Sequence, residues 1–175
     1  ARAASLDGWS DALGVLGRGA RADLPRQQTR EASIAWSVEL LDDSERLLLS
    51  RISVFVDGWT LDAAEAVATD DRLPVNSVFD ALDRLVDHSL VQVEDTHGGS
   101  RFRMLETVTQ FARRLVAVDL ADQRAVRDRH ARFFQSGLVL FDAGGGPATL
   151  TALGDRLVPD EENIRAAFDH LLTID

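Results

Sequence analysis

The spacing of apolar residues changes twice along this chain, and this double change limits the folds it can adopt. Up to about residue 88, apolar residues recur every three or four positions, the spacing of one helix face. Residues 89–95 (SLVQVED) and 100–105 (SRFRML) alternate instead, as strands do, and a His-Gly-Gly turn separates them. The helical spacing returns from Glu106. A hairpin enclosed by helices in this way predicts the wing of a winged helix.

Four helices are expected before this hairpin. Thr29 is an N-cap candidate for the first, one of the residues 42–44 for the second and Thr60 for the third. The fourth covers residues 73–90, where Phe79 and Val86 widen an apolar stripe. The side chains expected to form the winged-helix core are Ile34, Trp36, Leu48, Ile52, Phe55, Leu82, Leu85 and Phe111.

The C-terminal part of the chain has the pattern of helices only. A long helical pattern covers residues 122–141, and a Gly-rich loop follows it. Pro159 begins a last helix, with acids in its first turn where the helix dipole favours them. Its expected buried face consists of Ile164, Ala167, Phe168, Leu171 and Leu172. The sequence therefore predicts a mainly α fold, with a winged-helix domain over residues 29–118 and an α-helical segment, one form of which is TPR-like, over residues 119–175.

Composition argues against several kinds of chemistry. The net charge is −10, and all 19 basic residues are Arg. Without Lys the chain has no phosphate-binding P-loop and no Schiff-base chemistry. It has no Cys, which suits the reducing cytoplasm that we expect, and no apolar run long enough to cross a membrane. The four His residues lack the spacing of metal ligands, so we expect no metal site. We also expect no cofactor and no enzymatic activity in this chain.

The charge around the hairpin disfavours direct DNA binding. Residues 60–95 contain nine acids and two bases, a net charge of −7, on the elements that would approach DNA. Nucleic-acid affinity depends on basic side chains that neutralise phosphates. Arg101 and Arg103 alternate on one strand and share a face, where they can meet a phosphate or an acidic surface, although such pairs more often are simply solvated.

Several blocks of the sequence resemble bacterial transcriptional regulators of the STAND ATPase class. They include LPRQQTREASIAWSVELLDDSERLLLSRISVFVDGWTLDAAEAV, ALDRLVDHSLVQVE, SRFRMLETVTQFARRL, VRDRHARFF and DEENIRAAFDHLL, within roughly residues 20–172. In that class a winged helix follows an NB-ARC-type ATPase module and precedes a helical, often TPR-like, sensor region. LuxR-type or SARP-type DNA-binding domains often accompany them. The resemblance implies that residues 1–28 are the end of the ATPase-associated helical region and a linker.

The same resemblance implies a conformational switch. In related NB-ARC proteins a Met-His-Asp motif follows the wing, and its His contacts the ADP phosphates. This chain has Met104, Leu105 and Glu106 there, and Leu105 cannot donate a hydrogen bond to phosphate. The switch would then use Glu106 or shape alone. Arg101, Arg103, Leu105 and Glu106 are therefore the residues expected to face the nucleotide module upstream, which would bind ATP or ADP.

Three hypotheses follow. In the first, the chain is a non-catalytic regulatory segment that switches between the nucleotide module and the sensor region. In the second, it is the DNA-binding winged helix of a transcription factor, for which salt-dependent DNA binding is the test. In the third, its helical segment is a protein-interaction module that binds a partner or a second copy through an exposed apolar patch on residues 121–172.

Overall fold

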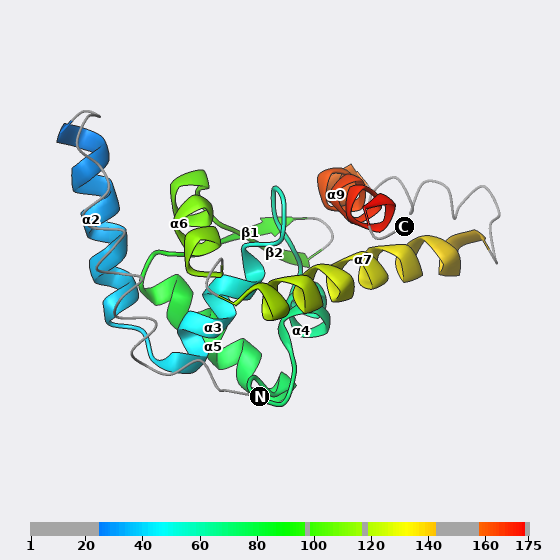
Figure 1. The fold of residues 1–175 in the computed structure, drawn as a ribbon, viewed down its shortest axis with the longest axis horizontal. Coiled ribbons are helices and arrows are strands. Elements are labelled where there is room, and N and C mark those ends of the chain that lie inside the picture. The colour runs from blue at the N-terminus through cyan, green and yellow to red at the C-terminus, as the bar shows by residue number, and fades with distance from the viewer. Residues whose placement is uncertain (1–24, 97–98, 117–118, 143–157, 174–175) are drawn as a thin grey trace.

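The computed structural model of the chain describes residues 25–96, 99–116, 119–142 and 158–173. The elements follow in the order shown in Figure 1. They are α2 (Pro25–Glu39), α3 (Asp43–Ile52), α4 (Leu61–Ala68), α5 (Val75–Asp87), β1 (Gln92–Thr96), β2 (Gly99–Arg103), α6 (Glu106–Val116), α7 (Leu120–Asp142), the 3-10 turn η1 (Val158–Asp160) and α9 (Glu161–Leu172). The predicted fold class, helices with a two-stranded wing and then further helices, is confirmed.

Side-chain caps explain where two of the helices begin. The Asp42 carboxylate accepts from the Glu45 N–H at 2.8 Å, and the Glu45 carboxylate accepts from the Asp42 N–H at 2.8 Å, a capping box at the start of α3. Thr60 caps α4, as predicted, by accepting from the Ala63 N–H. The prediction for the first helix is wrong. It begins at Pro25 and not at Thr29, because proline suits the first position of a helix.

The end of α5 directs the chain into the wing. Ser89 adopts a left-handed conformation with φ of 58°. Its N–H donates to the Val86 carbonyl at 2.8 Å, and the Leu90 N–H donates to the Leu85 carbonyl at 2.9 Å. This hydrogen-bond pattern is a Schellman motif, which ends a helix and reverses the chain. Leu90 and Val91 are buried as a result, immediately before β1 begins.

The predicted hairpin is confirmed. β1 and β2 pair antiparallel, with Val93 opposite Phe102. Trp59, which precedes α4, pairs with β2 on the edge away from β1, because its backbone exchanges hydrogen bonds of 2.9 and 2.8 Å with Phe102. Gly58 allows this close approach, since a Cβ at that position would lie 3.0 Å from the Phe102 carbonyl oxygen.

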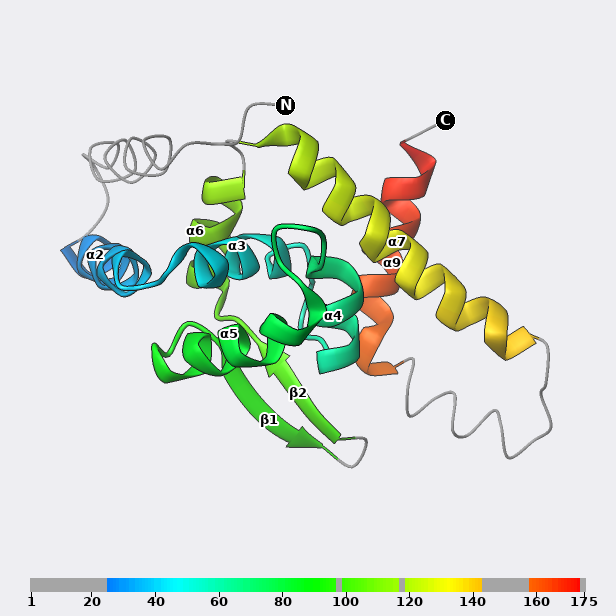
Figure 2. The same ribbon diagram turned by 90° about the horizontal axis from the view of Figure 1, so that it is seen from below.

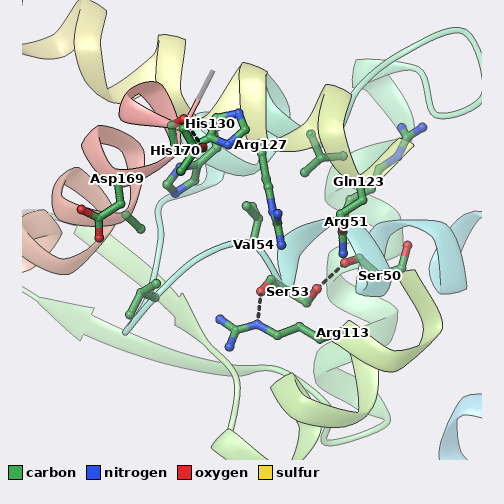
Figure 3. Close-up of a pocket in the computed structure, with 14 residues that line it drawn as sticks. Ser50, Arg51, Ser53, Val54, Arg113, Gln123, Arg127, His130, Asp169 and His170 are labelled. Atoms are coloured by element: carbon green, nitrogen blue, oxygen red, sulfur yellow. Dashed lines mark hydrogen bonds between the residues drawn. The ribbon is translucent and has the colours of Figure 1, made fainter. Parts of the chain in front are cut away.

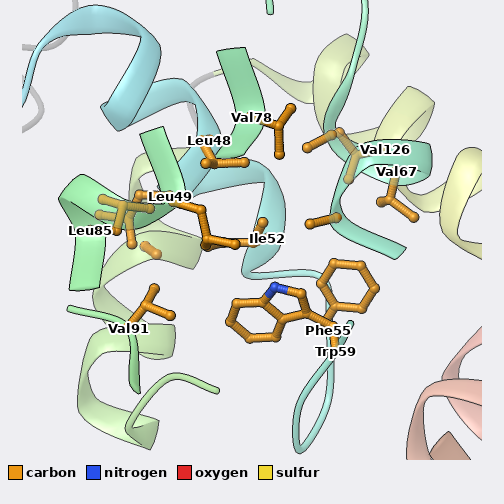
Figure 4. Packing of buried hydrophobic residues seen from close by; sticks show 14 of the residues in the cluster. Leu48, Leu49, Ile52, Phe55, Trp59, Val67, Val78, Leu85, Val91 and Val126 are labelled. Carbon is orange, nitrogen blue, oxygen red and sulfur yellow. The ribbon is translucent and has the colours of Figure 1, made fainter. Parts of the chain in front are cut away.

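The core lies between α3 and the elements around it (Figure 4). Leu48, Leu49 and Ile52 of α3 are fully buried, and burial of each such side chain stabilises the fold by roughly 1.5–3 kcal/mol. The rings of Phe55 and Trp59 stack at a centroid distance of 5.3 Å. Of the eight predicted core residues, Leu48, Ile52, Phe55, Leu82, Leu85 and Phe111 are buried, and Ile34 is partly buried against the core.

Four aromatic or aliphatic residues expected to be buried are exposed. The exposed fraction is 65% for Trp36, 57% for Phe79, 49% for Phe168 and 76% for Leu172. Trp36 lies two residues after Ile34, about 200° around the helix, so the two cannot share one buried face. On α5 and α9 the buried stripe is narrower than predicted, and only part of each apolar face contacts the core.

α5 and the wing lie on the side of the molecule opposite α7 (Figure 2). In Figure 2, α5 and the two strands are together on one side, while α7 runs along the other. α7 packs against α4 and α9. The outer surface of α5 is therefore left uncovered by the described C-terminal helices, whereas β2 of the wing contacts η1 through Arg101.

Candidate functional site

The outer face of α5 is the surface that a helix-turn-helix would use for recognition. α4 and α5 are joined by a tight turn, in which the backbone groups of Asp70 and Leu73 are hydrogen-bonded to each other. In DNA-binding helix-turn-helix domains the second helix enters the major groove, and its N-terminal residues contact the bases. The exposed residues at that end of α5 are Val75, Asn76 and Phe79.

The rest of this face is acidic. Asp80, Asp83 and Asp87 are exposed on α5, and Arg84 is the one exposed cation of the helix. Three carboxylates against one guanidinium give a net charge of −2. The face combines this negative charge with the apolar side chains of Val75 and Phe79, which are 55% and 57% exposed. Phosphate groups would be repelled here, whereas basic and apolar protein surfaces would be attracted.

Both arginines of the wing are engaged within the molecule. The Arg103 guanidinium donates to Glu94 at 2.9 Å on the neighbouring strand, and this hydrogen bond and charge raise the pKa of Arg103 above its ordinary value. Arg101 donates to the Asp160 carboxylate at 2.7 Å and to the Pro159 carbonyl at 2.9 Å, next to α9. Neither guanidinium of the wing is therefore held ready for a phosphate.

The four residues predicted to face a nucleotide module have different surroundings. Arg101 is bound to the η1 turn, and Arg103 to β1. Leu105 is 51% exposed just before α6, and Glu106 bonds to Gln110 in the first turn of that helix. Leu105 and Glu106 lie on a surface open to a partner, while Arg101 is half-buried against the C-terminal segment. That they contact a nucleotide module stays a prediction.

A buried ion network joins the helix-turn-helix to α7. Arg51, fully buried in α3, donates to Asp70 of the turn at 2.9 Å and to Asp122 of α7 at 2.8 and 3.2 Å. Arg72 also pairs with Asp122. The sequence contains one indication of this network. Arg51 lies three residues after Leu48 on the face predicted to be buried, where a charge requires a partner.

Asp70 shows how strongly this network holds its charges. Burial alone would raise the pKa of Asp70. The Arg51 guanidinium and the backbone N–H groups of Arg72 and Leu73 outweigh that effect and hold the pKa well below its usual range. The turn of the helix-turn-helix and the start of α7 are thus fixed by the same guanidinium.

A second junction holds α9 against the winged helix. Asn163 is fully buried, accepts from the Val56 N–H at 2.7 Å and donates to the Gly58 carbonyl at 2.7 Å. Its side-chain oxygen also lies 3.4 Å from Nε2 of His130 on α7. Burial lowers the pKa of His130 to about 4, so this ring is neutral at neutral pH.

The part of the chain that the structure describes lacks both a cluster of metal ligands and a membrane-spanning helix. No group of three or more His, Asp or Glu side chains in that part of the chain is arranged to hold a metal ion. None of the helices described is both long and apolar enough to span a membrane.

The central part of the chain matches a known protein family. Residues 41–117 match the family described as the winged helix-turn-helix domain. This range covers α3 to α6 and the wing between them. No solved structure matches the chain significantly.

Curated relatives match over most of the chain. A protein of Mycobacterium bovis named "Putative HTH-type transcriptional regulator" is 38% identical over 164 residues, which is 93% of this chain and 18% of the relative. Its Mycobacterium tuberculosis counterpart is equally similar. An uncharacterised protein of Mycobacterium tuberculosis is 31% identical over 142 residues, 81% of this chain and 36% of that protein. The chain thus spans about a fifth of the length of the named relatives.

These matches favour the second of the three hypotheses in its general form, a winged-helix domain of a transcription regulator. They do not bear on the ATPase switch. The relatives that are 38% identical are named as transcriptional regulators. Residues 41–117 therefore form a winged helix-turn-helix domain resembling a domain of proteins named as transcriptional regulators.

Proposed function

We propose that this winged helix serves a transcription regulator by docking on protein and does not itself bind DNA. The observation that carries the proposal is the outer face of α5, where Asp80, Asp83 and Asp87 surround a single Arg84. A helix that enters the major groove approaches phosphates on both sides, and the repulsion outweighs one or two favourable base contacts.

The chemistry of the partner follows from the same face. Val75 and Phe79 lie one helical turn apart and are both more than half exposed, and three carboxylates continue along the helix. An apolar anchor beside acidic groups suits a protein surface with an apolar pocket bordered by Arg or Lys. The expected partner is another part of the longer regulator or a protein bound to it.

A surface variant tests this function in a full-length parent regulator. The double substitution Val75→Ser and Phe79→Ser removes the apolar anchor at two positions that are more than half exposed, so the winged helix should stay folded. We expect the parent to lose its transcriptional response while its DNA affinity stays unchanged. Arg165→Ala, an exposed change on α9, is the matched control. A wild-type response from the double variant would contradict protein docking through α5.

DNA binding by the winged helix is the second candidate. It is favoured by the match of residues 41–117 to a helix-turn-helix family and by the names of the relatives. The exposed Asn76, near the start of α5, is of the residue type that bonds to adenine edges. A duplex that bound with a steep salt dependence, and lost affinity on Asn76→Ala, would establish this candidate.

The resemblance to STAND regulators supplies a more detailed form of the docking proposal. In that form Leu105 and Glu106, exposed at the start of α6, lie against an ATP- or ADP-binding module elsewhere in the parent. Titration of the 175-residue chain with ATP and ADP is the first test. Tight binding by this chain alone would contradict a nucleotide site outside it.

The helical segment offers a further docking surface. Phe168 and Leu172, one turn apart on α9, are exposed and apolar. They support the predicted interaction with a protein partner or a second copy. Analytical ultracentrifugation of the wild-type chain and of a Phe168→Ser variant tests self-association. If the chain self-associates through α9, the sedimenting mass should rise with concentration for the wild type only.

A further inference from the structure

A cavity of about 470 Å³ lies where the winged helix meets the C-terminal helices (Figure 3). Its walls come from the end of α3 and the residues after it, from α6, from α7 and from α9. The volume is within the range of roughly 300–1,000 Å³ that is typical of small-molecule sites. No function described above uses this cavity.

Two arginines from different helices face the cavity. Arg113 of α6 donates through Nε to the Ser53 carbonyl at 3.0 Å, which fixes the guanidinium at the cavity wall. Arg127 of α7 extends toward Ser53 and Val54 from the opposite wall in Figure 3. The neighbouring acids of α7 are engaged elsewhere, Asp122 with Arg51 and Asp128 with His170. Among the described residues Arg127 has no ion-pair partner.

The remaining lining separates into apolar and polar parts. Val54, Val56, Val126 and Ala166 form an apolar wall. Asp169 is the one unpaired acid of the lining within the described residues, and in Figure 3 its carboxylate points away from both arginines. Arg51 also lines the cavity, but Asp70 and Asp122 neutralise it. Two guanidiniums against one carboxylate leave the cavity with an excess of one positive charge.

We infer that this cavity binds a small organic anion, whose carboxylate or phosphate group lies between the guanidiniums of Arg113 and Arg127. Guanidinium groups donate paired hydrogen bonds to such oxyanions. The apolar wall accommodates a short hydrocarbon body, and His170 and Gln123 supply further polar contacts. The inference is independent of the proposed function, since a domain that docks on protein need not bind an anion.

The position of the cavity gives the anion a regulatory effect. Ser53 and Arg113 belong to the winged helix, whereas Arg127 and His170 belong to α7 and α9. An anion held between the two arginines therefore connects both parts. It stabilises the docked arrangement by a free energy that grows with the logarithm of one plus the ratio of its concentration to its dissociation constant. The ligand would act as an effector that holds the C-terminal helices on the winged helix.

Titrations of the 15N-labelled 175-residue chain with two probe anions test the inference. Inorganic phosphate and succinate are added in turn up to tens of millimolar, against chloride at matched ionic strength. Saturable amide shifts are expected at Ser53, Arg113, Arg127 and His170. Shifts with phosphate alone would indicate a phosphorylated ligand, and shifts with succinate alone a carboxylic acid. Both outcomes support the site.

Three variants make the test specific. Arg127→Gln removes no described hydrogen bond and should weaken binding about tenfold. Arg124→Gln, an exposed change on the same helix outside the cavity, should leave it unchanged, and Asp169→Asn should tighten it by removing the opposing charge. No saturable shift with either anion would overturn the inference. So would shifts that persist equally in Arg127→Gln, because the anion would then bind elsewhere.

Discussion

Among the buried charged groups of the described structure, the Arg51 guanidinium makes the most contacts. Its guanidinium contacts Asp70, Asp122 and the Ala68 carbonyl, so one side chain of α3 reaches the helix-turn-helix turn and α7 together. A buried ion pair adds little net stability over an apolar replacement, but loss of one partner leaves the others uncompensated.

The substitution Arg51→Ala should therefore be severely destabilising. It leaves the Asp122 carboxylate buried without its main counter-ion, and we expect the free energy of unfolding to fall by about 3–5 kcal/mol. Urea denaturation of the chain measures this loss. Arg165→Ala, which removes an exposed pair with Glu161, should change stability by less than about 0.5 kcal/mol. A similar small change for Arg51→Ala would show that the network is not needed.

His130 makes stability depend on pH. Its pKa is about 4 in the folded chain, because burial disfavours the charged ring, against an ordinary value of 6.5. The unfolded chain therefore binds more protons between these values, and stability falls as the pH drops from about 6.5 toward about 4. Between about pH 7 and pH 5 the loss from this one group is about 2 kcal/mol.

The measurement compares denaturation at both pH values for the wild type and His130→Gln. The variant lacks the titrating ring. Over the same pH interval, its free energy of unfolding should therefore fall by about 2 kcal/mol less than that of the wild type. An identical pH dependence in the two proteins would mean that His130 titrates normally in the fold.

Single residues were the hardest to predict from the sequence. Leu48, Leu85 and Phe111 were assigned correctly to the core because they lie in the centre of their apolar stripes. Trp36 was not, because it lies on the face of its helix opposite Ile34. Phe79 was not, because burial at the edge of a stripe depends on which neighbour covers it. The contact of Arg101 with Asp160 joins residues far apart in the sequence, which local patterns do not contain.

At the scale of elements, the Schellman motif at the end of α5 sets the position of the wing. Ser89 occupies the left-handed position that usually belongs to glycine. A non-glycine residue is strained there by roughly 1 kcal/mol. The backbone at Ser89, between α5 and β1, is therefore strained, and a substitution can remove this strain.

Ser89→Gly should accordingly stabilise the chain by about 0.5–1 kcal/mol, since glycine adopts this conformation without strain. Ser89→Ala is the matched control and should give no gain, because alanine keeps the Cβ that causes the strain. Thermal unfolding of the three proteins compares them. A Ser89→Gly variant less stable than the wild type would contradict the assigned strain.

Asn163 controls how α9 docks. Asn163→Ala leaves the Val56 N–H and the Gly58 carbonyl without their side-chain partner, at a cost of about 1–3 kcal/mol for a buried unpaired group. Hydrogen exchange should then accelerate in α9 while α3 and α5 keep their protection. Glu162→Ala, at the exposed neighbouring position, should change neither the exchange rates in α9 nor the protection of α3 and α5. Equal acceleration in all helices would indicate that α9 and the winged helix unfold as one unit.

The elements themselves were largely predictable. The change of spacing around residue 90 located both strands, and the acids at residues 42 and 43 located the start of α3. The start of α2 was missed because the segment around Pro25 contains Gly and Pro nearby, which resemble a linker, although proline also suits the first turn of a helix. Predictions for residues 1–24 and for the loop at 143–157 lie outside the described residues.

At the scale of the whole molecule, two junctions fix the C-terminal helices to the winged helix. The Arg51 network joins α3 to α7, and Asn163 with Arg101 joins the wing and the α3–α4 loop to α9. The opposite side, with α5, is acidic and is not covered by the C-terminal helices that the structure describes (Figure 2). This separation leaves one surface for an external partner and uses the other to connect the parts of the chain.

The most direct test of the central claim is the affinity of this chain for duplex DNA at low ionic strength. Fluorescence anisotropy with a labelled mixed-sequence duplex measures it, since non-specific binding requires only basic charge. A variant with Asp80→Lys, Asp83→Lys and Asp87→Lys is the positive control, because it keeps the helix-turn-helix geometry and reverses the charge of α5.

The account predicts no saturable binding by the wild-type chain at any salt concentration. The triple variant should bind, with an affinity that falls steeply as salt is added. Saturable binding by the wild type, weakened by salt and not exceeded by the triple variant, would contradict the claim that α5 docks on protein instead of DNA.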